Sequence, residues 1–492
     1  MNAGRFVSAG RTDHRSQTMD RIIAAISIMI LAVAVSCQDG AVHRPEQLGT
    51  RTVDVPALKN GVLETLDCGI DLFALPDQSG LLHAILYVRA GVGCEPHARP
   101  GLSLVTLEAL VKGGTSAYTP GRMEEIRRDR GFSISYRMAG EWVEIEIEAL
   151  KGDEREALTI FRELLLGGAF PAKAVDDAKA ALSEMIGKKG KNPLDRTRSA
   201  LYELMSEGGE QRNFFPDPGK VAFITRSDVV SFYRKRFVPA GSYIAINSEP
   251  SAASALAREL FAGAAKKSPE ACSSLPEKAG ESSVIILQKT GAEKACLGIG
   301  KILELPGGEG MLKEKPLLDI LGEVLCSESP LSRMNAELRG KRNIAGNVSL
   351  NITASRSPLS GFLEAYADPN AQDVGFASYI MSKTLTDLAS NPPSVEELEQ
   401  AKGRVLRKIG RASMNPREFL MLNMSFILQG FPAGYLNVYC GNVSGADAAA
   451  VAECAGRHFS LPRYKYAVYG SGDKFLKEIS VYGKVTMRGA GD

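Results

Sequence analysis

Alternating apolar and polar positions between Trp142 and Leu150 give the clearest structural signal in the chain. The odd positions from 143 to 149 are apolar and the even positions from 144 to 148 are glutamate, which predicts a strand with one buried face. Other runs of strand length lie at 72–75, 83–89, 132–138 and 242–248, and helix-type spacing covers 101–111, 154–166, 174–188, 193–205 and 227–237. The first half therefore combines a sheet with several helices.

The second half shows the same succession of patterns. Strand-like runs occupy 284–290, 296–303, 345–353, 362–368 and 465–471, and helix-type runs occupy 315–325, 374–388 and a segment that starts at Ser394. Residues 394–397 (SVEE) fit a capping box, in which a hydroxyl and a carboxylate satisfy free N–H groups at a helix start. Strands followed by runs of helices, twice, predict an α+β fold. We expect each half to be an antiparallel sheet with helices packed on one face.

One sixteen-residue segment occurs in both halves. Residues 178–193 read AKAALSEMIGKKGKNP and residues 401–416 read AKGRVLRKIGRASMNP. Six positions are identical at a displacement of 223, and Pro239 matches Pro462 at the same displacement. A solenoid repeat spans only about 20–50 residues, so this period indicates two copies of a whole domain. The alternative is two unrelated amphipathic helices that both end at Asn-Pro.

A stretch with little apolar periodicity separates the two copies. Residues 250–282 are rich in Ala, Ser, Lys, Glu and Pro, a composition typical of a linker. The sequence therefore predicts an N-terminal domain at 55–250, a linker at 251–282 and a C-terminal domain at 283–488.

The N-terminus has the pattern of a targeting segment. Residues 22–36 (IIAAISIMILAVAVS) form an uncharged apolar run that is shorter than the roughly 20 residues of a membrane span and typical of a signal-peptide core. The run ends in small residues before Cys37, which resembles the lipobox of bacterial lipoproteins, so Cys37 is the expected lipidation site. A plain secretory signal is the alternative. The expected segments are a lipoprotein-type signal peptide at 1–36, with its start at Met1 or Met19, and a tether at 37–54.

This prediction implies a protein on the periplasmic side of a bacterial envelope, held to a membrane by a lipid anchor only.

Charge is balanced beyond the signal peptide. The whole chain has 59 basic and 57 acidic residues, and residues 1–36 contain four arginines and two aspartates, which leaves 55 of each sign. That balance gives no reason to expect nucleic acid as a partner.

Neither the cysteines nor the histidines form a recognisable metal motif. Beyond Cys37, seven cysteines are spread over more than 380 residues without a CxxC pair, which argues against a disulfide framework and a zinc–cysteine site. One or two disulfides remain compatible with an oxidising compartment. No two histidines have the spacing of helical metal ligands; the five are His14, His43, His83, His97 and His458.

The layout resembles that of the insulinase-like (pitrilysin) zinc metallopeptidases, which include the mitochondrial processing peptidases. The resemblance spans roughly residues 55–485 and includes a pair of homologous α+β domains. Residues 88–95 (VRAGVGCE) match the strand and turn before the family's zinc helix, Gly101 to Ser103 match the start of that helix, and residues 112–115 (KGGT) match its end. The resemblance implies the metallopeptidase-like fold of the processing peptidases in both domains.

The family's zinc motif, His-x-x-Glu-His, is absent from this helix. Counted from Gly101, the two histidine positions hold Leu104 and Glu108, and the glutamate position holds Leu107. Two histidines at i and i+4 share one helix face and hold Zn²⁺, and the adjacent glutamate acts as general base. Counting back from Thr115 instead gives positions 105, 108 and 109, again without histidine. We therefore expect no catalytic residues and the loss of the zinc cofactor.

Two other elements of the family pattern are kept only in part. The family's third zinc ligand, a glutamate on a later helix, corresponds to Glu184, and the second copy of the repeat has Arg407 there. In the second domain the family places an arginine and a tyrosine that hold the substrate backbone near zinc. Arg339 matches the arginine, and Gly346 stands at the tyrosine position, where a hydroxyl would stabilise a tetrahedral intermediate. Arg339 is thus the one expected substrate-binding residue, with a surface salt bridge as the alternative.

The resemblance implies a catalytically inactive homologue. Family chains of this size commonly pair, one with zinc and one without, and enclose a chamber that admits extended peptides. We expect the non-catalytic subunit of a periplasmic zinc-peptidase complex, with a zinc-bearing family chain or a second copy of itself as partner. Peptides would bind by adding to a sheet edge. The alternatives are a stand-alone peptide-binding or scaffold lipoprotein, and an active zinc metalloendopeptidase with a non-standard site.

Overall fold

The computed structural model describes residues 57–205, 216, 218–272, 281–356, 359–460 and 463–490. The predicted signal peptide, Cys37 and the tether lie outside the described residues. Every residue described below belongs to one compact unit, Thr52–Asp492.

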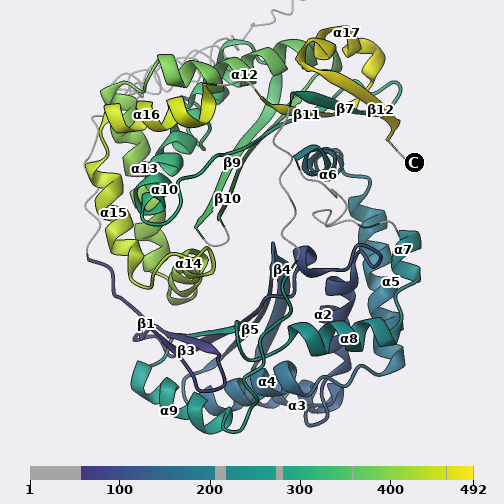
Figure 1. Cartoon of the computed structure of the whole chain (residues 1–492), viewed down its shortest axis with the longest axis vertical. Helices are drawn as coiled ribbons and strands as arrows, with labels where there is room; N and C mark the ends of the chain where they lie inside the picture. Colours follow the sequence, from purple (N-terminus) through teal and green to yellow (C-terminus); the bar gives the residue numbers. More distant parts are fainter. Residues whose placement is uncertain are drawn as a thin grey trace, which may run out of the picture. The chain divides into compact units, whose positions relative to one another are not determined.

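Six strands form the sheet of the first half, in the order β1-β2-β6-β3-β5-β4 (Figure 1). The strands are β1 (Val62–Thr65), β2 (Asp71–Ala74), β3 (Leu81–Val88), β4 (Ser133–Ala139), β5 (Trp142–Leu150) and β6 (Tyr243–Ile246). The bounds of β5 coincide with the alternating segment of the sequence. Even-numbered residues of β3, such as Leu82 and Leu86, pack into a core shared with the helices of this half.

The helices of the first half follow the strands in two runs. They are α2 (Leu102–Gly113), α3 (Pro120–Arg130), α4 (Glu154–Leu166), α5 (Ala172–Lys189), α6 (Pro193–Met205), α7 (Pro218–Ala222), α8 (Arg226–Arg236) and α9 (Pro250–Leu260), with a short 3₁₀ helix η2 (Val92–Cys94). The amphipathic α4 shows why they form: most of its apolar positions, including Leu158 and Phe161, are buried, whereas its glutamates remain partly accessible to solvent.

The second half has a sheet of the same design, in the order β12-β7-β11-β8-β10-β9. Its strands are β7 (Ser283–Gln288), β8 (Cys296–Ile302), β9 (Ala345–Arg356), β10 (Leu359–Pro369), β11 (Lys465–Gly470) and β12 (Lys484–Gly489). Its helices are α10 (Gly310–Leu325), α11 (Arg333–Asn335), the π-helix η4 (Ala336–Lys341), α12 (Val374–Ser390), α13 (Val395–Ser413), α14 (Pro416–Leu428), α15 (Tyr435–Gly445), α16 (Ala448–Phe459) and α17 (Leu476–Ile479), with 3₁₀ turns η5 (Ala371–Asp373), η6 (Gly472–Lys474) and η7 (Ser480–Tyr482).

The two sheets confirm the α+β class, but they are mixed rather than antiparallel. β6 lies parallel to β2 in the first sheet, and β11 and β12 both lie parallel to β7 in the second. Each closing strand, β6 or β11, is reached through a run of helices. A crossover of that kind lets the returning strand lie parallel to its neighbour, whereas a tight hairpin does not.

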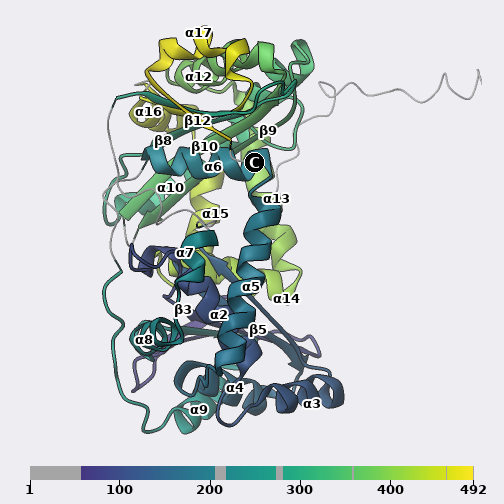
Figure 2. The same cartoon turned by 90° about the vertical axis from the view of Figure 1, so that its right-hand side faces the viewer.

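Each half also places one helix on the sheet of the other half, so the helices are not confined to one face. In the first half, α6 lies against the sheet of the second half (Figure 2). It contacts β7, β8 and β11, and its buried Leu201 joins Ile285 and Ala467 in a shared core. Gly298 and Gly300 of β8 make room for it: a Cβ at Gly300 would lie 2.7 Å from the Met205 sulfur. The glycines of this strand therefore position α6.

The reciprocal contact is made by α14 of the second half. The Arg417 guanidinium binds both carboxylate oxygens of Glu146 on β5, with Nη2 2.6 Å from Oε2. Ile85 and Tyr87, on the odd-numbered face of β3, belong to the large core of the second half. The two halves are thus joined through both sheets.

Residues 251–282, predicted as a linker, contain ordered structure that belongs to the first half. Helix α9 buries Ala253 and Ala257 in the first core, and Cys272 forms a disulfide with Cys94. The buried residues of α9 are small, so the sequence lacks the large apolar periodicity by which helices are recognised. Residues 273–280 lie outside the described part of the chain.

Candidate functional site

Helix α2 is the helix that the sequence matches to the family's zinc helix, and its start is held by the buried Glu95 side chain. Glu95 Oε2 accepts a hydrogen bond from the Gly101 backbone N–H (2.8 Å), and Oε1 accepts one from Ser103 N–H (2.7 Å). Gly101 has φ +88°, in the left-handed region that glycine adopts most readily. Burial raises the pKa of Glu95 to about 7, against the lowering effect of these two bonds. The turn matched by the family pattern therefore serves to cap α2.

The three degenerate zinc positions on α2 do not form a metal site. Leu104 packs against the first core and Leu107 is buried within it. Glu108 accepts a hydrogen bond from the Tyr136 hydroxyl (2.7 Å) and pairs with Lys112 one turn further on. Its carboxylate is therefore engaged by a hydroxyl and an ammonium group, the usual means by which a half-buried carboxylate is satisfied.

The fourth position, Glu184, lies on the solvent side of α5. Its side chain is 68% exposed and accepts a hydrogen bond from Lys188 Nζ at 2.6 Å, which lowers the pKa of Glu184. Arg407, its counterpart in the second copy, is exposed on α13. Within the described ranges, His83 is buried on β3 and His97 is exposed, and neither joins a cluster of three metal-ligand side chains.

The arginine and the glycine of the second-domain segment do not line the pocket described next, between η4 and α12. Arg339 lies in the π-helix η4, exposed to solvent, and pairs with no carboxylate in the described part of the chain. Gly346 begins β9, where its N–H and that of Asn347 donate to Asp368 Oδ1 (2.7 and 2.6 Å). A Cβ at Gly346 would have its nearest neighbours at 3.5 Å, so the backbone has room for the side chain that the family pattern places there.

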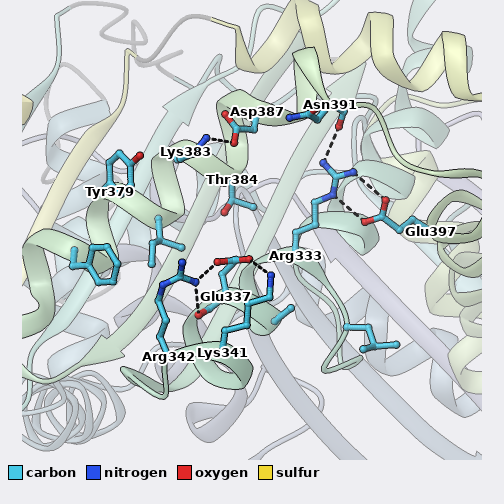
Figure 3. Close-up of a pocket in the computed structure, with 14 residues that line it drawn as sticks. Arg333, Glu337, Lys341, Arg342, Tyr379, Lys383, Thr384, Asp387, Asn391 and Glu397 are labelled. Carbon is cyan, nitrogen blue, oxygen red and sulfur yellow. Dashed lines mark hydrogen bonds and ion pairs between the residues drawn. The ribbon is translucent and has the colours of Figure 1, made fainter. Parts of the chain in front are cut away.

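A pocket of about 520 Å³ lies beside this segment, between η4 and helix α12 (Figure 3). Its apolar wall carries two exposed rings, Phe376 and Tyr379, stacked with centroids 6.4 Å apart. The Arg342 guanidinium lies 5.6 Å from the Phe376 ring centre, within the range of a cation–π contact. The pocket therefore offers flat aromatic surface next to positive charge.

Every basic side chain that lines the pocket pairs with a carboxylate that also lines it. Arg333 forms two hydrogen bonds to Glu397 (both 3.0 Å), and Lys341 and Arg342 both bind Glu337. Lys383 pairs with Asp387 in the same way. The residues that line the pocket include no Cys, His or Ser. The lining thus offers charged, hydrogen-bonding and aromatic contacts to a ligand.

Arg339, the substrate-binding residue expected from the sequence, does not line this pocket, whereas Arg333 and Arg342 of the same segment do. The signal that separates them is the π-helix: its wider turn changes the direction of residues 336–341 relative to an α-helix, and π-turns recur at functional sites. Helical spacing alone cannot show that change.

No helix in the described part of the chain is long and apolar enough to cross a membrane.

Comparisons with known proteins agree with this geometry. The model of the M16 peptidase inactive domain matches residues 224–405. The solved structure of an M16 peptidase inactive domain from Pseudomonas fluorescens superposes with a TM-score of 0.74 at 16% identity, covering 84% of this chain and 98% of that chain. A protease from Helicobacter pylori superposes with a TM-score of 0.75 at 14% identity, covering 84% of this chain and 100% of that chain. The periplasmic protease PqqL from Escherichia coli superposes with a TM-score of 0.72 at 14% identity, covering 85% of this chain and 46% of that chain. No curated protein matches the chain.

The fold, the family match and the solved structures define a class, the M16 peptidase fold. Within this class, the match to the inactive-domain model confirms the predicted resemblance to a non-catalytic insulinase-like chain. The chain thus resembles the insulinase-like family through this inactive-domain match over residues 224–405 and through its fold.

Proposed function

We propose that this chain is the non-catalytic partner of a zinc-bearing insulinase-family peptidase, in which it binds extended peptides without cleaving them. The observation that carries the proposal is helix α2. This helix, which the sequence matches to the zinc helix, is capped and packed in the first core. At the matched positions Leu107 is buried and Glu108 is engaged by Tyr136 and Lys112. A scaffold kept in this way, without its metal ligands, fits a role in binding.

Open sheet edges support peptide binding. β4 ends the first sheet and β9 ends the second, and no other strand of the described residues pairs with their outer sides. An extended peptide that adds to such an edge is held by backbone hydrogen bonds. These bonds need no particular side chains, so this capacity is independent of zinc. The aromatic and charged pocket beside η4 would contribute contacts to a partner or to the peptide.

The proposed location is the periplasmic side of a bacterial envelope, with a lipid on Cys37. The disulfide between Cys94 and Cys272 supports an oxidising compartment, where such bonds persist. A structurally similar protease, PqqL, is periplasmic. Mass spectrometry of the mature N-terminus tests the lipid directly.

We also propose that the two halves arose by duplication of one domain. The displacement of 223 that relates the repeated segment also relates α6 (Pro193–Met205) to α14 (Pro416–Leu428). Five strands correspond in order, from β2 with β7 to β6 with β11, and only the outer strands β1 and β12 come from opposite ends of the chain.

The partnership is tested by isolating the chain from its native envelope and adding it back to what it binds. The expected result is a co-isolated chain with the His-x-x-Glu-His motif whose cleavage of extended peptides increases when this chain is restored. A homodimer or monomer that leaves peptide cleavage unchanged would favour the stand-alone scaffold instead.

Peptide capture at a sheet edge has its own test. Only alternate N–H groups of an added strand point toward the sheet. A bound peptide should therefore lose affinity when one alternate set of its amides is N-methylated and keep it when the other set is methylated. Equal losses from both sets would exclude edge addition.

A further inference from the structure

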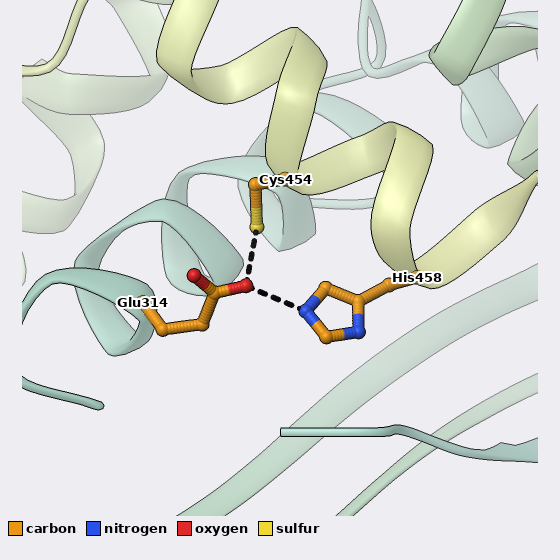
Figure 4. Close-up of side chains that lie close together, drawn as sticks. All are labelled: Glu314, Cys454 and His458. Carbon is orange, nitrogen blue, oxygen red and sulfur yellow. Dashed lines mark hydrogen bonds and ion pairs between the residues drawn. The ribbon is translucent and has the colours of Figure 1, made fainter. Parts of the chain in front are cut away.

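Three side chains able to ligate a metal converge inside the second half, far in sequence from the degenerate zinc motif. Glu314 lies on α10, and Cys454 and His458 lie on α16 (Figure 4). One ligand atom from each lies within 4.8 Å of the other two. His458 Nε2 is 2.6 Å from Glu314 Oε1, and Cys454 Sγ is 3.4 Å from the same oxygen. This is the one such cluster in the described part of the chain.

The sequence contains the signal for half of this cluster. Cys454 and His458 are spaced i, i+4 on one helix, so they share a face and project to the same side. A search restricted to pairs of histidines misses them. Glu314 is 140 residues away from Cys454, and only the packing of α10 against α16 brings it to the pair.

All three side chains are removed from solvent. Cys454, His458 and Glu314 are 0%, 1% and 4% exposed. Burial acts to raise the pKa of Glu314, but hydrogen bonds from His458 and Arg457 outweigh it and hold that pKa below its usual value. Burial and the neighbouring Glu314 raise the pKa of the Cys454 thiol.

We propose that Glu314, Cys454 and His458 bind a divalent transition-metal ion of the zinc class. The donor set of thiolate, imidazole and carboxylate is the one that Zn²⁺ prefers in proteins. In a tetrahedral site with metal–ligand distances of about 2.0–2.3 Å, ligand atoms lie roughly 3.3–3.7 Å apart. The sulfur–oxygen distance of 3.4 Å already fits, and the nitrogen–oxygen distance must open by well under 1 Å.

The protons and charges balance on binding. The thiol of Cys454 loses its proton to solvent and becomes the thiolate that forms the metal–sulfur bond. The thiolate and the Glu314 carboxylate together neutralise the ion's two positive charges. His458 Nδ1 is buried without a partner in the described residues, so no bond at that atom prevents the ring proton from moving there and leaving Nε2 free for the metal.

A neighbouring arginine would support the site from outside. Arg457 Nη2 binds the second oxygen of Glu314 at 2.7 Å, which leaves Oε1 for the metal, as outer partners of metal-ligating carboxylates do. Arg457 is 42% exposed and so gives the ion a route past a movable side chain. With three protein ligands from two helices, the ion would brace α10 against α16, and a fourth ligand position would hold water.

The test uses the untagged full-length chain, stripped with a chelator under mild reduction and then given Zn²⁺ or Co²⁺. We expect one equivalent of zinc by native mass spectrometry. The cobalt form should show the visible bands of a tetrahedral ion and a thiolate charge-transfer band. Binding should weaken as pH falls, because protons compete with the metal for the ligand atoms.

Variants distinguish this site from the degenerate peptidase positions. Cys454→Ser and His458→Gln should abolish the bound equivalent and the thiolate band, whereas the matched controls Glu184→Gln and Cys440→Ser should keep both. If a ligand variant fails to fold, the cobalt spectrum of the unaltered chain decides alone. The proposal is overturned if that chain binds no metal, if cobalt shows no thiolate band, or if the controls lose the ion as readily. The cluster is then a buried carboxylate satisfied by three donors, and the proposed peptide-binding function is unaffected.

Discussion

Replacement of Leu201 by alanine tests the contact by which the first half lies on the sheet of the second. Leu201 is fully buried between α6 and the strands β7, β8 and β11. Leu201→Ala removes three carbons, worth about 0.8 kcal/mol each on burial. The cavity left behind adds to this loss, since the glycine strand beneath cannot fill it. We expect the free energy of unfolding to fall by about 3–4 kcal/mol.

Urea unfolding of the purified chain measures this change, and Leu194→Ala is the matched control. Leu194 lies on the same helix but is 36% exposed, so its truncation should cost well under 1 kcal/mol. Gly300→Ala gives a second check. Its new Cβ would meet the Met205 sulfur at 2.7 Å and both Leu201 Cδ atoms at 3.1 Å, so it should destabilise alone by about 1–3 kcal/mol.

A double-mutant cycle completes the test. Part of the cost of Gly300→Ala should disappear in the Leu201→Ala background, because the smaller side chain leaves space for the added methyl group. If Leu201→Ala and Leu194→Ala had the same small effect, α6 would not lie on the second sheet, and the reasoning would fail.

Three further predictions follow from buried or linked side chains. Cys272→Ser removes a cross-link that closes a 178-residue separation with Cys94, and chemical denaturation should show a loss of up to about 5 kcal/mol that reducing agent reproduces in the unaltered chain. The pKa of Glu95 rises from 4.5 to about 7 on folding. Its contribution to folding stability is therefore complete below pH 4.5 and is lost as pH rises through 7. Stability measured against pH should show that Glu95→Gln removes a decline of about 3 kcal/mol, and parallel curves would contradict this. Arg417→Met should lower the free energy of unfolding by about 1–3 kcal/mol, because it leaves Glu146 unpaired. The loss should be smaller at high salt, since Arg417 is 41% exposed and an exposed ion pair is screened. An equal loss of stability at low and high salt would refute the pairing.

The sequence predicts elements well wherever apolar periodicity is strong. β5 and α6 coincide with their predicted ranges, Trp142–Leu150 and Pro193–Met205. The charged helix α3 escapes notice because it buries only Met123 and Ile126 among its eleven residues. Helix α9 is concealed for a related reason, since its buried face consists of alanines.

Long-range partners are the part that local patterns cannot supply. The direction of a strand depends on how a run of helices returns the chain to the sheet. The sequences of β2 and β6 alone therefore do not predict that the two strands pair in parallel. The same holds for the pairing of Cys94 with Cys272 and for the approach of Glu314 to His458. The pocket beside η4, which is lined by Arg333 and Arg342, likewise depends on helix α12, and helical spacing in the segment itself does not reveal it.

The central claim is that the chain keeps the peptidase scaffold without the reaction. Its most direct test is a cleavage assay of the purified chain on a mixture of extended peptides, with zinc supplied and with or without a chelator. The account predicts no cleavage under either condition, even if zinc binds at Glu314, Cys454 and His458. Cleavage that a chelator stops, and that Glu184→Gln abolishes while Cys454→Ser preserves it, would show a working zinc centre on α2 and α5 and would contradict the account.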